Sequence, residues 1–405
     1  MKYLFISILV LGLLTREFFW INERHIYQEN EIYKKSYSFV HEPKKNSLSQ
    51  YFFTDGLLVT IPLYPSYHYG DKVLIEGKIE MRDSKKGKLL IVENPRISKI
   101  HNADPLLFFS KSVRQKVEEN VMTTLPTKEG GLLLGVILGV RDKIDSEYYQ
   151  QLKNAGVLHV IAASGQNVSI AAMLLLTVFS TFVKRRMALL FTALGVLLYA
   201  VLTGFDPPIV RASIMAILAF TALFTGRQIS SIYVLFLTGW AMLFVQPEEI
   251  VDVSFQLSFL STFGILTVKP LLDSLLRFKL LSFVKDDITT TLSAQIATFP
   301  LMITVFGAYS LLSFPVNILV LWTIPIIMIF GGLAGLLSLF LPFMAKPLIL
   351  LCYPFLSYFK TIVELFSKIN LQISMDTVPT ISIFGYYLIL LVVVIKYKER
   401  KFIKK

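Results

Sequence analysis

The feature that most constrains the fold of this chain is a series of long apolar segments. From residue 155 onward, apolar stretches of about 20 residues alternate with short polar loops, and a helix of roughly that length crosses the ~30 Å hydrocarbon layer of a bilayer. Only 17% of the 405 residues are charged, against roughly 25% in soluble domains. The sequence therefore predicts a polytopic α-helical membrane protein.

The apolar runs predict about ten membrane spans. The first is an N-terminal anchor at residues 1–20, which we expect to stay uncleaved because large and charged residues follow it where a signal peptide would have small ones. The others lie in the predicted transmembrane core, residues 155–395, at 155–182, 187–204, 207–225, 230–247, 253–268, 290–312, 315–340, 345–368 and 380–395.

The distribution of basic residues predicts the orientation of these spans. If the N-terminus is cytoplasmic, the basic loops at 184–186, 227 and 269–285, Lys346 and the basic tail 396–405 all fall inside, and the acidic Glu248 and Glu249 fall outside. This agrees with the excess of Lys and Arg in cytoplasmic loops of membrane proteins. We therefore expect both termini to be cytoplasmic.

Two regions before the core have a different pattern. Residues 48–102 contain four or five short β-prone runs separated by Pro and Gly, which suits a small OB-like β-barrel, placed outside by the orientation above. Residues 105–152 are amphipathic and include the apolar run 131–140. Because that run is too short to cross, we expect it to lie at the membrane interface or to re-enter.

Polar residues interrupt the first span of the core. His159, Ser164, Gly165, Gln166 and Asn167 lie within one apolar segment. Polar groups in hydrocarbon are costly and mark functional sites, and they favour a helix that opens and lines a wet cavity. Packing of small residues between helices is the alternative.

A second polar site lies at residues 202–218. Asp206 and Pro207, followed by Pro208, are typical of a helix start. Arg211 then falls one turn inside the membrane, where its planar donors fit phosphate oxygens. The alternative is that Arg211 reaches outward or pairs with a carboxylate, Asp206 or Glu249.

Further polar or helix-disrupting residues lie in later spans. Gln256 and Gln295 can form hydrogen bonds across the bundle. Pro300 and the segment containing Asn317 would kink or restart helices and free carbonyls that could face a cavity. Arg141 belongs to a mixed charged cluster that we expect in a solvated loop.

Several classes of active site are not supported. The single cysteine, Cys352, excludes a disulfide framework, and none of the five histidines has the spacing of a metal pair. Neither a phosphate-binding glycine loop nor a Gly-x-Ser-x-Gly elbow is present. We therefore predict no cofactor, no metal and no enzymatic activity, and any ATP-driven motor would be a separate protein.

Four stretches in order resemble the ComEC-type competence family: residues 130–175, which include "HVIAASGQN", and 202–228, 251–270 and 292–321. The resemblance implies a channel for single-stranded DNA in the bacterial cytoplasmic membrane, used in natural transformation. Family motif positions correspond to Arg141, His159, Ser164, Gly165, Pro208, Arg211, Gln256 and Pro300. The segment 48–102 is similar to the OB-like domain of the family, where Phe53, Tyr64 and Tyr67 would stack on bases. Arg141 is a further candidate for a contact with DNA.

The sequence departs from the family pattern in two ways. The usual "SGLH" reads "SGQN", so that Asn167 replaces a histidine. The metallo-β-lactamase-like domain of full-length members is not expected here, because the histidines cannot build its site, so strand degradation would need a separate nuclease. The sequence is also compatible with a homo-oligomer and with contacts to membrane lipid.

The cargo is left open by the residues themselves. A DNA channel, a permease or exporter of another anionic or lipid cargo, and a membrane-embedded enzyme or scaffold all place polar groups in a bundle. Deletion of the protein separates the first two classes. Under the permease or exporter hypothesis transformation would survive, and a metabolite or envelope phenotype would appear instead. Turnover of a lipid or peptide that depends on His159 would indicate the third.

Overall fold

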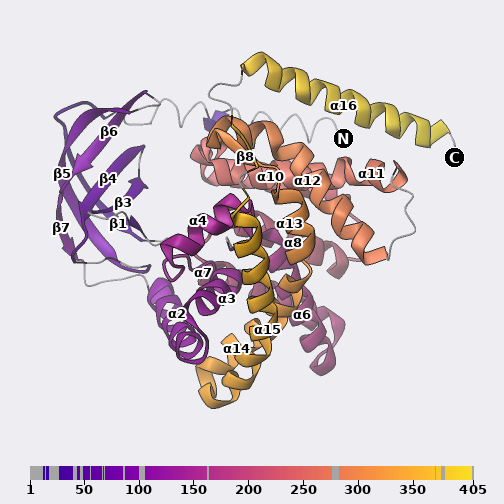
Figure 1. Cartoon of the computed structure of the whole chain (residues 1–405), viewed down its shortest axis with the longest axis horizontal. Coiled ribbons are helices and arrows are strands. Elements are labelled where there is room, and N and C mark those ends of the chain that lie inside the picture. Colours follow the sequence, from indigo (N-terminus) through magenta and orange to yellow (C-terminus); the bar gives the residue numbers. More distant parts are fainter. Residues whose placement is uncertain are drawn as a thin grey trace. The chain divides into compact units, whose positions relative to one another are not determined.

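The computed structural model (Figure 1) divides into a β unit, Glu17–Val117, and a helical unit, which holds Glu118–Lys405 and the first residues of the chain. The structure describes residues 12–13, 15–17, 27–39, 43–45, 49–54, 56–65, 67, 69–84, 87–99, 105–161, 164–275, 282–369, 371–374 and 379–403. Most of the predicted anchor at 1–20 lies outside these residues.

The β unit is built on one sheet, whose order is β1-β5-β6-β4-β3-β2 with β7 also paired to β5. All pairs are antiparallel except β4 with β6. The strands are β1 Ile32–Ser38, β2 Lys44–Lys45, β3 Ser49–Thr54, β4 Leu57–Pro62, β5 Lys72–Ser84, β6 Gly87–Glu93 and β7 Arg96–Lys99.

Alternation along the strands forms the core of this unit. In β4, Leu57, Val59 and Ile61 are buried while the residues between them are partly exposed, as expected for a strand with one face in a core. Phe39 and Phe52 pack beside them, with ring centroids 5.0 Å apart. A half-buried sheet of this kind follows from the period-2 pattern of the sequence.

The sheet starts earlier in the sequence than predicted. β1 precedes the expected boundary at residue 48 and pairs with β5 from Ile32 to Ser38. Among the described residues no hydrogen-bonded pairing joins β1 to β2, so the strand order does not close into a ring. The OB-like barrel therefore stays a prediction, and the described strands form an open sheet.

The helical unit follows, beginning within α2. Its elements are α2 Pro105–Thr124, α3 Thr127–Leu138, α4 Ser146–Asn154, α5 Leu158–Ile161, α6 Gly165–Phe182, α7 Arg185–Thr203, α8 Pro207–Phe224, α9 Ser231–Val245, η1 Pro247–Val251, α10 Val253–Thr267, α11 Lys269–Leu275, α12 Ser282–Phe306, β8 Ala308–Ser310, α13 Ser313–Val320, α14 Thr323–Phe340, α15 Pro342–Ser367, β9 Gln372–Ser374 and α16 Thr380–Ile403.

The described part of the chain contains 6 helices that are long and apolar enough to cross a membrane, or 7 if α10 and α11, bent by 42°, are one span. Each segment predicted from residue 155 onward overlaps one or two helices of the described chain, but the predicted count of about ten spans is not reached. The difference arises because α9 has 15 residues, the apolar part of α16 is also short, and the N-terminal segment lies outside the described residues.

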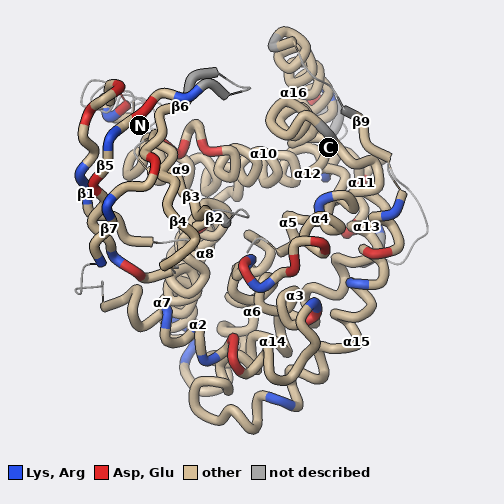
Figure 2. Tube along the Cα trace, turned by 60° about the vertical axis from the view of Figure 1, so that its left-hand side comes forward, with Lys and Arg blue, Asp and Glu red and all other residues tan. Residues whose placement is uncertain are grey.

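Charged residues occur on many elements of both units but are absent from several helices (Figure 2). Several strands of the β unit carry Lys, Arg, Asp and Glu, whereas α6, α9, α10 and α14 carry none. In α8 the only charged residue is Arg211. A charge in such surroundings is costly unless it is compensated, so the environment of Arg211 needs a specific explanation.

Helix α3 contains the short apolar run and is enclosed by the helical unit. All ten residues from Glu129 to Leu138 are buried. A helix lying along the membrane interface would keep one face against lipid, so this burial favours the re-entrant alternative for residues 131–140.

Helices α10 and α12 approach each other very closely at Gly264. A methyl group added there would lie 2.6 Å from the carbonyl oxygen of Ser293 and even nearer to the side chain of Ala297. Glycine therefore permits a contact between backbones that no other residue allows.

The proline in α12 leaves a carbonyl that another helix satisfies. Pro300 has no N–H, so the carbonyl of Ile296 loses its partner within the helix. The Tyr386 hydroxyl of α16 donates to this oxygen at 2.9 Å, and the neighbouring Tyr387 hydroxyl donates to Ala297 O at 3.0 Å. The sequence suggested that this freed carbonyl could face a cavity. In the structure it accepts a hydrogen bond from α16 instead.

Candidate functional site

The candidate site is centred on a break in the first core span. Helix α5 ends at Ile161 and α6 begins at Gly165, and Ser164 between them has extended backbone. Ser164 makes no side-chain cap bond, and no acceptor for the N–H groups of Gly165 or Gln166 is found among the described residues. Within the described part of the chain, the start of α6 therefore presents unpaired donors and the positive end of the helix dipole.

Asn167 joins this break to the end of α3. It accepts from the Ser164 hydroxyl at 3.1 Å and donates from Nδ2 to the Val136 carbonyl at 2.8 Å. The next carbonyl, Ile137 O, accepts from the Tyr199 hydroxyl at 3.1 Å. Helix α3 ends within the bundle at Gly139, whose φ is 70°, and these side chains satisfy carbonyls that every helix end leaves open.

The remaining residues of the predicted polar cluster are more open. His159 and Gln166 are exposed, and Ser164 and Gly165 are partly exposed, whereas Asn167 is buried. The cluster thus has a bonded side against α3 and an accessible side. This division supports both a packing role for Asn167 and a contact role for the others.

Arg211 is held between α8 and α10. It is 7% exposed, donates from Nε to the Ser258 hydroxyl at 2.8 Å, and donates from Nη1 to the Thr262 hydroxyl. It pairs with neither Asp206 nor Glu249, the partners considered from the sequence. A methyl group on Gly165 would lie 2.5 Å from Nη2, so the guanidinium lies against the start of α6.

Two other predicted residues meet through a serine that the sequence did not single out. Gln295 and Asn317 both donate to the Ser313 hydroxyl, each at 3.2 Å. Ser313 in turn donates to the carbonyl of Gly156 at 3.1 Å. These bonds link α12 and α13 to the turn before α5. The side-chain oxygen of Asn317 is buried and has no hydrogen-bond partner among the described residues.

Gln256 lies elsewhere, in an apolar groove between α10, α12 and α16. Its amide already donates to the Ile250 carbonyl at 2.7 Å. Most of the groove lining is aliphatic or aromatic, with Thr304 and Tyr387 as the other polar side chains. The structure therefore does not bring Gln256 together with the break.

The start of α8 is partly as predicted. Pro207 and Pro208 occupy its first turn and Asp206 the preceding position, but the carboxylate makes no cap bond. Instead, Asp206 Oδ2 lies 3.6 Å from Arg141 Nη2. Arg141, predicted as a contact for DNA, is thus an exposed residue beside a carboxylate.

The predicted aromatic contacts in the β unit divide in two. Phe53 and Tyr64 are 58% and 80% exposed. Tyr67 is buried, and its ring stacks on Phe39 with centroids 5.8 Å apart. The buried Gln50 accepts from the Tyr67 N–H at 3.3 Å and so holds the residue in the core. A ring that is buried in this way does not offer a surface for a base to stack on.

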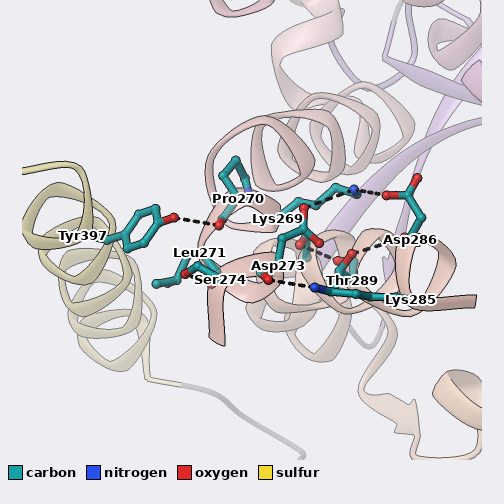
Figure 3. A network of polar contacts seen from close by, with 10 residues as sticks. Lys269, Pro270, Leu271, Asp273, Ser274, Lys285, Asp286, Thr289 and Tyr397 are labelled. Carbon is teal, nitrogen blue, oxygen red and sulfur yellow. Dashed lines mark hydrogen bonds and ion pairs between the residues drawn. The ribbon is translucent and has the colours of Figure 1, made fainter. Parts of the chain in front are cut away.

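A second polar cluster lies at the junction of α11 and α12 (Figure 3). Lys269 Nζ lies 2.6 Å from Asp286 and 3.4 Å from Asp273, and Lys285 donates to the Asp273 carbonyl at 2.9 Å. The Tyr397 hydroxyl of α16 donates to Pro270 O at 2.9 Å. The sequence marked 269–285 only as a basic loop, because single-sequence patterns do not show which charges pair.

Two ion pairs join α3 to α15. Glu129, 2% exposed at its side chain, pairs with Lys360, and the neighbouring Lys128 lies 3.1 Å from Glu364, with both of those side chains about one third exposed. The sequence analysis missed both pairs, whose members lie more than 200 positions apart. Among the described residues no group of three or more His, Cys, Asp or Glu could hold a metal ion.

Comparison with known proteins places this bundle in a family. A model of the "Competence protein" family matches residues 136–400, a range that begins at the end of α3 and includes the break, Arg211 and the later helices. The chain belongs to the competence protein family. The resemblance carried by "HVIAASGQN" and the three later stretches is thereby confirmed.

Two individual relatives are similar to part of the chain. "ComE operon protein 3" of Bacillus subtilis (strain 168) is 25% identical over 230 residues, which are 56% of this chain and 29% of that protein. An "Uncharacterized protein" of Aquifex aeolicus (strain VF5) is 32% identical over 126 residues, which are 31% of this chain and 30% of that protein. The chain thus aligns with less than a third of either relative. No solved structure matches significantly.

Proposed function

We propose that this chain forms a membrane channel that passes single-stranded DNA across the bacterial cytoplasmic membrane during DNA uptake for transformation. One observation carries the proposal: the range matched by the competence family, 136–400, contains the broken helix and the only charged residue of α8. Polar groups and open backbone donors within an apolar bundle are typical of transport routes.

The accessible side of the polar cluster is the proposed contact with the strand. His159 and Gln166 are exposed beside the start of α6, and they supply ring nitrogens and an amide that can bond to phosphate, sugar or base. The bonded side, Asn167 with Val136, would hold the route open. The role is transport and not catalysis.

The β unit would receive the strand on the outer side of the membrane. Phe53 and Tyr64 are its exposed aromatic candidates, and stacking of a base on an aromatic ring contributes about 1–3 kcal/mol. The positive-inside distribution of charge supports this orientation, with both termini cytoplasmic. A separate nuclease, a separate cytoplasmic motor protein and a homo-oligomeric assembly complete the proposal.

Uptake of labelled DNA tests the channel. In a transformable bacterium that lacks its own competence protein, the wild-type chain should restore entry of fluorescent DNA into the cytoplasm. The double variant with His159→Phe and Gln166→Leu should enter the membrane in equal amount but reduce uptake about tenfold, because the exposed polar contacts are removed. Thr181→Val is the matched control, since Thr181 is exposed on α6 but bonds only to its own helix.

Two results would contradict the channel. Full DNA entry in the double variant would remove the polar cluster from the route. Undiminished transformation after deletion in the source bacterium, together with an envelope defect, would favour an exporter of another anionic or lipid cargo.

A further inference from the structure

Among the described residues, no carboxylate balances the charge of the Arg211 guanidinium. Its partners within the described residues are the hydroxyls of Ser258 and Thr262 and the sulfur of Met215, all of them neutral. A buried cation without a counter-ion is strongly disfavoured. With 7% of the residue exposed, water compensates this charge only slightly.

The bonds of Arg211 use only part of its donor set. Nε and Nη1 donate to hydroxyls of α10, and these two bonds connect α8 to α10. Nη2 has no acceptor among the described residues. It is directed at the start of α6, because a methyl group on Gly165 would lie 2.5 Å from it.

The start of α6 offers matching donors. The N–H groups of Gly165 and Gln166 have no acceptor in the described part of the chain, and Ser164 does not cap them. An 18-residue helix carries about half a positive charge at this end. Such ends bind phosphate through their N–H groups.

We propose that Arg211 Nη2 and the N-terminus of α6 form a binding site for one phosphodiester group. Together they supply several donors and positive potential at one point, which suits the tetrahedral oxygens of a phosphate better than a spherical anion. The inference rests on the proposed function and deepens it, because it names the chemical group that the route binds. The diester belongs to a DNA backbone or to a phospholipid headgroup.

Binding by the purified full chain in detergent tests the site. The probes are fluorescent oligothymidylate of ten nucleotides, its uncharged methylphosphonate analogue, and labelled phosphatidylglycerol. Arg211→Met removes the charge and keeps an apolar side chain of similar length. Gly165→Ala keeps every charge but places a methyl group where Nη2 lies. Arg227→Gln removes the same charge from an exposed position after α8 and is the control.

Both site variants should bind oligothymidylate at least about tenfold more weakly than the wild type, since each loses a charge-assisted hydrogen bond. Arg227→Gln should change the affinity less than about twofold at moderate salt. The methylphosphonate analogue should bind weakly and equally to all four proteins. Thermal unfolding checks that each variant is folded. If Arg211→Met does not fold, the affinity of Gly165→Ala for the probes tests the site.

The other outcomes are equally informative. If both site variants lose phosphatidylglycerol and keep oligothymidylate, the phosphodiester site stands and its ligand is lipid, so that the DNA channel fails separately. Unchanged affinity of Gly165→Ala for both charged probes, or an equal loss for the methylphosphonate, would overturn the site even if DNA uptake depends on the protein.

Discussion

Substitution of Lys360 by methionine tests how α3 is held inside the bundle. The change leaves the carboxylate of Glu129, 2% exposed, without the ammonium that it pairs with. Breaking a fully buried pair in this way costs about 3–5 kcal/mol. Because the Lys360 side chain is 25% exposed, water reaches one end of the pair, and we expect the lower end of this range, about 3 kcal/mol.

The second ion pair between the same helices is the matched control. Lys128 and Glu364 have side chains 33% and 34% exposed, and pairs open to water contribute about 0–1 kcal/mol. Lys128→Met should therefore reduce the free energy of unfolding by about 1 kcal/mol or less. Both variants lose one positive charge, so the difference between their free energies of unfolding reports the effect of burial.

Equilibrium unfolding in mixed micelles of increasing dodecyl sulfate content measures these free energies. The double variant with Glu129→Leu and Lys360→Met should recover most of the stability lost in Lys360→Met, since an apolar pair of similar volume replaces a buried ion pair at little cost. The reasoning is refuted if Lys360→Met costs no more than Lys128→Met, or if the double variant is less stable than the single one.

Two further predictions concern α12 and the loop before α10. Tyr386→Phe should destabilise the chain by about 1–3 kcal/mol, because it leaves the Ile296 carbonyl unpaired; in a Pro300→Ala background the helix supplies its own N–H and the same change should cost less, which a double-mutant cycle in micelles measures. Burial, together with two neighbouring carboxylates, raises the pKa of Glu249 to about 7. The folded state then binds this proton more tightly than the unfolded state, so stability should fall as pH rises from about 4.5 to 7. Thermal unfolding at pH 5 and pH 8 measures this difference in stability, and Glu249→Gln should make it smaller. If the difference between the two pH values is unchanged in Glu249→Gln, the Glu249 carboxyl is not its source.

The helices were predictable because the length and apolarity of a span can be read directly from consecutive residues. The burial of α3 could not be predicted, since ten apolar residues are compatible with a position at the membrane interface, in a re-entrant segment or in a protein core. The start of the sheet was missed because β1, IYKKSYS, has polar residues where alternation would reveal a strand.

The candidate site shows the same limit. Asn167, Gln295 and Asn317 could be singled out as candidates because amides are rare in apolar helices. Their partners, the Val136 carbonyl and the Ser313 hydroxyl, could not be found, because a backbone carbonyl leaves no trace in the sequence and serine is common in such helices. Tyr67 was misplaced because exposure depends on a fold that one tyrosine does not reveal.

The contact at Gly264 has a practical consequence for anyone who wishes to observe this protein at work. Because there is no room for even a methyl group between α10 and α12 at Gly264, we expect these two helices to move as a single rigid body. Spectroscopic probes attached to both helices should then report the same separation before and during transport. One probe on this body and one on α8, across the hydroxyl contacts of Arg211, would instead report any opening between them.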